Sequence, residues 1–198
     1  MKYSDKSEIF KIETDHKIPT RGECLIAEPF LSDEPFGRSV VMMIDHTAEG
    51  SMGIITNKRL PILVNDVVKE FQYLNDIPLF CGGPLGEDML FFLHSIPEIS
   101  DAVQLSKNLY FNGNFTELKR YILQGNPFEG KIRFFLGYSG WAAGQLQQEI
   151  EENTWVIGRL LSEQLLQERH SQLWHNAMHS LGDKYQTWAR FPQIPSLN

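Results

Sequence analysis

Short apolar runs bounded by glycine, proline or aspartate constrain the fold of this chain more than any other feature of its sequence. The runs at Cys24–Ala27 and 40–44 have the length and the flanking residues of buried β-strands. Residues 51–57 follow after a short connection, so the second and third runs are predicted to form an antiparallel hairpin. Further strands are predicted at residues 79–81, 89–94, 107–111, 131–136 and 155–157.

Helical periodicity separates some of these runs but not all of them. An amphipathic helix is predicted over residues 63–71, and a second begins after Asn114, where Glu117 completes a pattern of capping-box type. A short acidic helix is predicted over 146–152, and the C-terminal part of the chain is predicted to be helical. Strands and helices do not alternate one for one. An α+β fold is therefore expected rather than a doubly wound parallel sheet.

Length and composition favour one intracellular domain. The chain has 198 residues without a linker-like stretch, so residues 1–198 are expected to share one core. Its net charge of -7 disfavours non-specific binding to nucleic acid. The opening residues lack the apolar core of a signal peptide, and no apolar run is long enough to span a membrane. Cys24 and Cys81 lie in separate apolar runs, which suits a reducing cytosol.

The run from Gly137 to Gly144 is the first candidate for chemistry. Ser139 follows a predicted strand as a nucleophile would, but Trp141 stands where the nucleophile elbow requires glycine. The same glycines could present backbone N–H groups to a phosphate, yet the Walker lysine and the dinucleotide-binding glycine spacing are both missing. A sharp turn against the sheet is the favoured interpretation.

Histidines are the second candidate. His175 and His179 are spaced to share a metal ion on a helix, although a solvated helix face is the commoner explanation. His94 and His46 lie at strand ends, where either could act as a general base, but neither has an evident nucleophile beside it. No catalytic residue, metal site or cofactor is assigned. Enzyme activity is left undecided, although the lack of a complete catalytic set of residues argues against it.

Several motifs together resemble the AlgH/YqgE family. The opening part of the chain carries three of them in order, at 22–29, 36–41 and 50–57. Gly82, Gly83 and Pro84 followed by His94 are similar to the central motif of that family, and Gly137–Leu146 with Glu149 and Trp155 is similar to its third motif. Trp174, Leu181 and Gly182 extend the likeness, which thus covers most of the chain.

This resemblance implies a bacterial cytoplasmic protein with an α+β fold, in which a bent mixed or antiparallel sheet closes into a pseudo-barrel flanked by helices. It implies no established enzyme activity. Members are often labelled transcriptional regulators, but no DNA-binding motif is present here and direct nucleic-acid binding is not expected. Ser139 stands where the family pattern usually has alanine.

The resemblance also implies site residues by position. The motif residues with structural explanations are Gly82, Gly83, Pro84, Gly140, Trp141 and Gly144. The polar motif residues, which would need partners if buried, are Arg38, Asn57, His94, Gln145 and Glu149. We hypothesise that some of these five converge on one cleft at strand ends and bind a ligand.

Two classes of function follow. The leading one is a non-catalytic regulatory or interaction protein whose partner is another protein. The alternative is a small-molecule-binding protein or enzyme with a site around His94, Arg38 and the turn at 140–149, and direct DNA binding is a minor third.

Overall fold

The computed structural model describes residues 13–167 and 169–192, which form an α+β fold around a mixed sheet of 10 strands. The strands are β1 (Cys24–Ala27), β2 (Val40–Thr47), β3 (Gly50–Ile55), β4 (Arg59–Leu63), β5 (Pro78–Cys81), β6 (Leu85–His94), β7 (Val103–Ser106), β8 (Leu109–Phe111), β9 (Ile132–Ala142) and β10 (Trp155–Gly158). The helices are α1 (Val64–Val67), the 3₁₀ helix η2 (Lys69–Phe71), α2 (Phe115–Leu123), α3 (Gln145–Glu151), α4 (Ser162–Gln167), α5 (His170–Ser180) and α6 (Asp183–Ala189).

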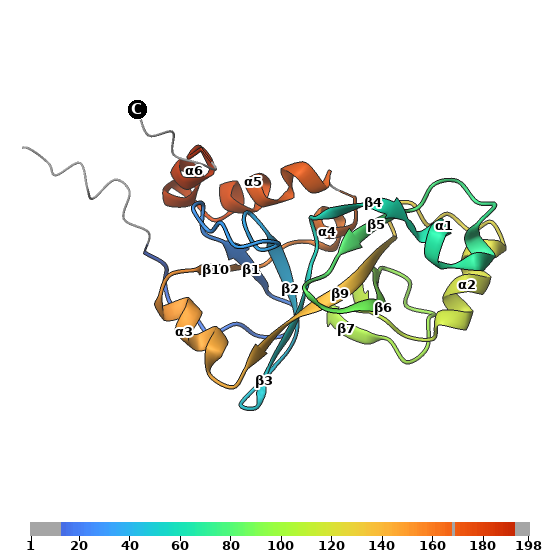
Figure 1. Cartoon of the computed structure of the whole chain (residues 1–198), viewed down its shortest axis with the longest axis horizontal. Helices are drawn as coiled ribbons and strands as arrows, with labels where there is room; N and C mark the ends of the chain where they lie inside the picture. Colours follow the sequence, from blue (N-terminus) through green and yellow to red (C-terminus); the bar gives the residue numbers. More distant parts are fainter. Residues whose placement is uncertain (1–12, 168, 193–198) are drawn as a thin grey trace, which may run out of the picture.

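The long strand β9 joins two halves of the sheet (Figure 1). Its C-terminal residues pair with β3, which continues through β2 and β1 to β10, and we call these four strands the first half-sheet. Its N-terminal residues pair with β6 on one side and, in parallel, with β5 on the other. Strands β4 to β8 form the second half-sheet.

The expected closure into a pseudo-barrel is not seen. The strand order begins at β10 and ends at β7, and no pairing joins these two strands in the described part of the chain. The physical reason is that β10 and β7 belong to different half-sheets, which diverge from β9 (Figure 1). The sheet is mixed, as expected, because the pairing of β5 with β9 is parallel and the other pairings are antiparallel.

The first half-sheet is buried on both faces, which explains its uninterrupted apolar runs. Alternate residues of β1 and β2, such as Ile26 and Met42, pack in a core that includes residues of α5 and α6. Their neighbours, such as Leu25 and Val41, pack with Leu146 of α3 on the opposite face. Figure 1 shows α5 and α6 on one side of these strands and α3 on the other.

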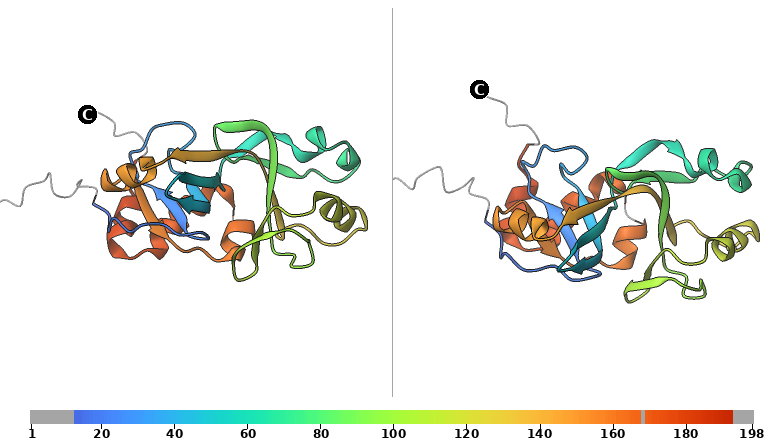
Figure 2. Two further views of the ribbon diagram at one scale, coloured as in Figure 1. Left: turned by 90° about the horizontal axis from the view of Figure 1, so that it is seen from below. Right: turned by 60° about the horizontal axis from the view of Figure 1, so that its bottom comes forward.

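The second half-sheet is covered differently. One face shares the core of the first half-sheet through Phe91 and Phe135, together with Leu165 of α4. The other face carries Phe92 and Phe134, which pack with residues of α1, η2 and α2 in a separate apolar cluster. Figure 2 shows from two further sides that α1 and α2 lie at the opposite end of the molecule from α3, α5 and α6.

Three local predictions are corrected by the structure. The helix expected over 63–71 is only the four-residue α1 followed by η2, because Val68 is extended and interrupts it. The strand expected over 107–111 is confined to β8, because residues 107 and 108 form the turn that connects it to β7 in a hairpin. The turn expected after residue 136 does not exist, since β9 continues to Ala142. The predicted hairpin of β2 and β3 is confirmed.

Candidate functional site

His94 has a structural role at the end of β6. Its side chain is fully buried, its Nε2 lies 2.8 Å from the carbonyl oxygen of Asn112, and the backbone N–H of Ile96 donates to its Nδ1. A neutral imidazole protonated on Nε2 satisfies both contacts. Burial lowers the pKa of His94, which favours that neutral form. The side chain fastens the end of β6 to the segment after β8.

Glu149 and Gln145 form a second, separate arrangement on α3. One carboxylate oxygen of Glu149 accepts hydrogen bonds from the indole N–H groups of Trp141 and Trp155, both at 2.8 Å. Its other oxygen accepts from the side-chain amide of Gln145, whose own oxygen accepts from the backbone N–H of Ala142. Glu149 thus connects α3 to β9 and β10, and its oxygens are occupied by protein donors.

Arg38 and Asn57 are the two predicted site residues that the structure does bring together. Asn57 follows β3, and its amide bridges the backbone N–H of Val40 and the carbonyl of Arg38. The Arg38 guanidinium lies 4.7 Å from the centre of the Trp174 ring and donates through Nη2 to the carbonyl of Phe191. The Nε atom of Arg38 is buried without a hydrogen-bond partner.

A cavity of about 490 Å³ opens beside this pair. Its lining residues come from the segment before β2, the segment after β3 and the first turns of α5. They are Arg38, Asn57, Lys58, His170, Ser171, Gln172, Trp174, His175 and Asn176. The sequence motifs indicated Arg38 and Asn57 but not the residues from α5, because the contact between α5 and β2 depends on the tertiary fold.

The five polar motif residues therefore do not converge on one cleft. Trp174, against which Arg38 lies, packs with α5 on one face of the first half-sheet. Trp141 and Trp155, which bind Glu149, pack with α3 on the opposite face. His94 ends β6 in the second half-sheet. Arg38 and Asn57 share one cavity, whereas His94 and the pair of Gln145 and Glu149 lie at two other junctions of the fold.

The glycine motifs mark a close approach of two backbone segments. A Cβ atom on Gly82 would lie 2.1 Å from the carbonyl oxygen of Gly137, and one on Gly83 would lie 2.2 Å from the carbonyl carbon of Tyr138. Ser139 is fully buried and donates its hydroxyl hydrogen to the carbonyl of Gly82. It lies within β9 rather than on an elbow, so the geometry that activates a nucleophilic serine is absent.

The remaining motif positions are structural or open to solvent. Gly140 pairs with Met52 of β3, and a Cβ there would lie 2.8 Å from the Leu85 side chain. Gly144 precedes α3 in a left-handed conformation, whereas Pro84 is exposed after the glycine pair. The rings of His175 and His179 lie with their centres 4.7 Å apart. Across residues 13–167 and 169–192, no group of three or more His, Cys, Asp or Glu side chains could hold a metal ion.

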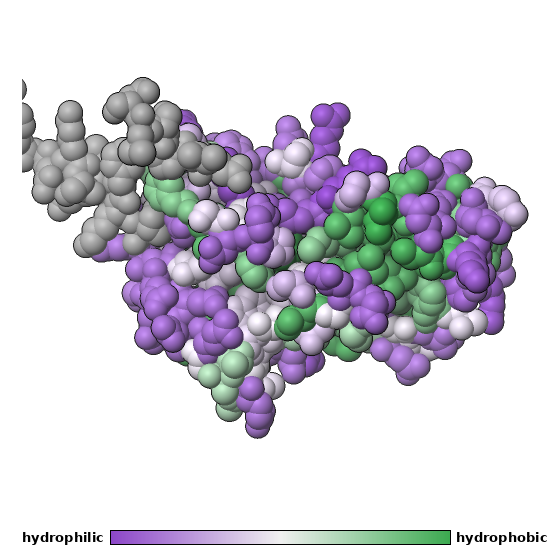
Figure 3. All heavy atoms as spheres, viewed as in Figure 1, coloured by the Kyte–Doolittle hydropathy of each residue, from purple (hydrophilic) through white to green (hydrophobic). Residues whose placement is uncertain are grey.

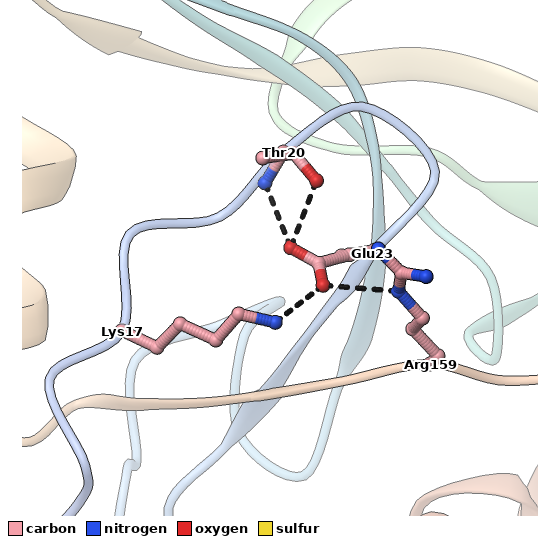
Figure 4. A network of polar contacts seen from close by, with 4 residues as sticks. All are labelled: Lys17, Thr20, Glu23 and Arg159. Atoms are coloured by element: carbon pink, nitrogen blue, oxygen red, sulfur yellow. Dashed lines mark hydrogen bonds and ion pairs between the residues drawn. The ribbon is translucent and has the colours of Figure 1, made fainter.

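Sequence reasoning missed a buried carboxylate before β1. Glu23 accepts hydrogen bonds from Lys17, from the backbone and hydroxyl of Thr20, and from Arg159, as Figure 4 shows. Burial opposes its ionisation, but these donors outweigh burial and lower the pKa of Glu23 to about 2. Its position directly before a fully buried strand was the one signal in the sequence that this carboxylate needs partners.

An apolar area is open to solvent on the second half-sheet. Leu90 of β6 and Leu136 of β9 are cross-strand neighbours, and both pack, only partly buried, against the same cluster as Leu60 of β4. Ile62, two residues beyond Leu60, is 40% exposed. We call Leu60, Ile62, Leu90 and Leu136 the open apolar face. Figure 3 shows a continuous hydrophobic area over this part of the molecule, bordered by hydrophilic residues.

Comparisons with known proteins give a consistent result. A family model described as AlgH-like matches residues 24–186. Two UPF0301 proteins, from Bacteroides fragilis and Bacteroides thetaiotaomicron, are 56% and 54% identical to this chain over 97% of its length and 98% of their own.

Among the described residues, no helix is both long and apolar enough to cross a membrane.

Two solved structures share the fold. A protein from Corynebacterium diphtheriae superposes with a TM-score of 0.76 at 24% identity, covering 90% of this chain and 95% of that one. The AlgH protein from Pseudomonas aeruginosa superposes with a TM-score of 0.67 at 24% identity, covering 89% of this chain and 97% of that one.

Proposed function

The chain belongs to the AlgH-like family, and we propose that it is a non-catalytic regulatory protein of the bacterial cytoplasm that works by binding another protein. The open apolar face is the observation that carries this proposal. Soluble monomers rarely expose a continuous apolar area on a sheet, and an apolar centre with a polar rim is typical of protein interfaces.

The partner is expected to present a segment with large apolar side chains. Leu90 and Leu136 lie next to each other across two strands, and Leu60 packs against the same cluster, so the three side chains form one shallow surface rather than scattered exposures. Burying an isoleucine or leucine side chain contributes about 1.5–3 kcal/mol, so a few such contacts suffice for a specific complex.

The polar motif residues give independent support for a non-catalytic role. His94, Asn57 and Glu149 already exchange hydrogen bonds with the backbone or with tryptophans of this chain. General acid–base work needs a side chain with a free position toward a substrate. These three residues instead support the fold that presents the apolar face.

Direct DNA binding is not favoured by the arrangement of the basic residues. Among the basic residues, Lys119 pairs with Glu70 at 2.5 Å, and Arg133 is buried and donates to the carbonyl of Thr56. A phosphate backbone requires several free cations on one face.

Substitution of Ile62 tests the proposal. Wild-type protein and the Ile62→Asp and Leu161→Asp variants are each used to capture proteins from extract of the source bacterium. Leu161 is 68% exposed and lines the cavity of Arg21 and Arg159 instead, so its variant is the matched control. A partner captured by the wild type is then purified, and its dissociation constant is measured for all three proteins.

We expect Ile62→Asp to weaken that complex at least tenfold, which corresponds to about 1.4 kcal/mol, and Leu161→Asp to leave it unchanged. Equal affinity of the wild type and Ile62→Asp would contradict the proposal. Concentration-dependent self-association that Ile62→Asp abolishes would also contradict it, because a second copy of this chain would then be the occupant.

A further inference from the structure

We propose that the cavity beside Arg38 is a binding site for a small molecule bearing a phosphate group. This inference is independent of the proposed function, because the cavity borders α5 and β2 rather than the open apolar face. Its volume of about 490 Å³ falls within the range of small-molecule sites.

The first argument is charge. Arg38 and Lys58 line the cavity together with His170 and His175, and none of its described lining residues is acidic. Neither Arg38 nor Lys58 takes part in an ion pair between described residues, and Lys58 instead donates to the carbonyl of Gly37. Uncompensated cations in one hollow of a chain with net charge -7 favour an anionic ligand.

The second argument is the comparison with another cavity of this protein. A hollow of about 540 Å³ is also lined by basic residues, among them Arg21 and Arg159. There, however, Arg21 pairs with Asp45, Arg159 pairs with Glu23, and Glu163 is itself part of the lining. Among the described residues, both arginines of that hollow are paired with carboxylates of the protein and only Lys107 is not, whereas neither Arg38 nor Lys58 has such a partner.

The third argument concerns hydrogen-bond donors. The cavity is bordered by Ser171 and Gln172 in the first turn of α5, which has neither a side-chain cap nor an acidic residue. The N–H of Gln172 donates to the carbonyl of Arg169, so Ser171 supplies the N–H that could attract phosphate at this helix N-terminus. Arg38 adds a guanidinium whose Nε has no partner, on a backbone held at φ 52. A buried donor without a partner and a backbone at positive φ show that Arg38 is held in a strained position beside the cavity.

Phosphate fits this donor set better than a single carboxylate does. Two cations and a helix N-terminus surround one space, and phosphate offers more acceptor oxygens and more negative charge to them. The exposed His175 and the half-buried His170 also line the cavity, and a neutral imidazole can still donate one N–H.

An NMR titration with inorganic phosphate and with diphosphate tests this site. The backbone amide signals of Ser171 and Gln172 are expected to shift on addition of either probe at about 10 mM, which exceeds a dissociation constant of about 1 mM tenfold. Absence of any shift at these two amides would overturn the proposal. Equal shifts at the cavity of Arg21 and Arg159 would also overturn it, because binding would then follow surface charge alone.

Two pairs of variants make the result specific. Ser171→Glu places a carboxylate in the cavity while adding a favourable negative charge to the helix N-terminus, so the protein stays folded and loses binding. Ser171→Gln, similar in size but neutral, retains binding. Lys58→Gln weakens diphosphate about tenfold. Lys107→Gln, which removes an equal charge from the other cavity, changes nothing.

The opposite pattern would overturn the proposal. If Ser171→Glu, folded by circular dichroism, binds diphosphate as the wild type does, the first turn of α5 does not contact the anion. If Lys58→Gln and Lys107→Gln weaken binding equally, the cavity has no part in recognition.

Discussion

Glu23 illustrates how one residue depends on partners that are remote in the sequence. Its side chain is 1% exposed and pairs with Lys17 and with Arg159, which is separated from it by most of the chain. Because hydrogen bonds from Lys17, Thr20 and Arg159 outweigh burial, the pKa of Glu23 falls from 4.5 to about 2. A depressed pKa means that the ionised carboxylate stabilises the folded state at neutral pH.

We predict that Glu23→Gln lowers the free energy of unfolding by about 2 kcal/mol near pH 7, less than the full linkage value because Lys17 and Arg159 are exposed. This contribution is present above pH 4.5 and is lost as the pH falls through about 2. The difference between variant and wild type, measured by urea unfolding, should therefore shrink in acid.

Asp45→Asn is the matched control, because the Arg21–Asp45 pair is half exposed on both sides. It should cost less than about 1 kcal/mol at any pH. A difference for Glu23→Gln that does not change with pH would show that packing, and not charge, is what the substitution removes.

The same dependence on remote partners limited what could be predicted for the site. Motif likeness identified Arg38, Asn57, His94 and Glu149 as polar residues needing partners, but a linear sequence does not say which atoms meet. Asn112 pairs with His94, and Trp174 lies against Arg38. The partners are remote in the sequence and differ from one motif residue to the next, so only Arg38 and Asn57 of these residues line the same cavity.

At the scale of elements, patterns of burial were the reliable signal. The apolar runs that became β1, β2 and β10 lie between helices on both faces, so their composition reflects the tertiary fold directly. Asn114 also behaves as its sequence context predicts, since its side chain accepts from the N–H groups of Thr116 and Glu117 at the start of α2.

The predicted elements were wrong in two situations: where a side chain replaces backbone hydrogen bonds, and where glycines of two segments pack against each other. Asn65 donates to the carbonyls of Phe71 and Leu74 and accepts from the N–H of Ile77, which draws the chain into a loop and ends α1 early. Gly137 lies against Gly83, so the glycines of β9 permit close packing rather than a turn.

The carboxylate of Glu149 on α3 accepts from two tryptophans of the sheet, which gives a prediction at this scale. Trp141 and Trp155 are 6% and 2% exposed, so Glu149→Ala would leave two buried indole N–H groups without acceptors. Each unpaired donor costs about 1–3 kcal/mol. We predict a loss of about 2–4 kcal/mol in urea unfolding and a change in tryptophan fluorescence.

Gln147→Ala on the same helix serves as its control. Gln147 bonds only to the exposed Glu151 one turn on, so its removal should cost less than about 0.5 kcal/mol. Similar losses for both variants would mean that α3 is stabilised by its own helical contacts and not by the bond to the two tryptophans.

At the scale of the whole molecule, the two half-sheets are connected at Gly82. Its N–H donates to Leu136 of β9 and its carbonyl accepts from Ile55 of β3 and from the Ser139 hydroxyl. One residue thus bonds to the end of the first half-sheet and to the middle of β9. The sequence predicted one domain over residues 1–198, and this connection is the physical reason to expect one cooperative unit.

We predict that Gly82→Ala costs more than about 3 kcal/mol, because its Cβ would lie 2.1 Å from the backbone oxygen of Gly137 and the junction would have to separate. Gly125→Ala is the control: Gly125 has a positive φ but open space around it, so only backbone strain of about 1 kcal/mol is expected. Calorimetry should give one transition for both proteins. Two separate transitions in the wild-type protein would mean that β9 connects two independent domains. A single transition at a lower temperature in Gly82→Ala would show that this glycine couples the two half-sheets.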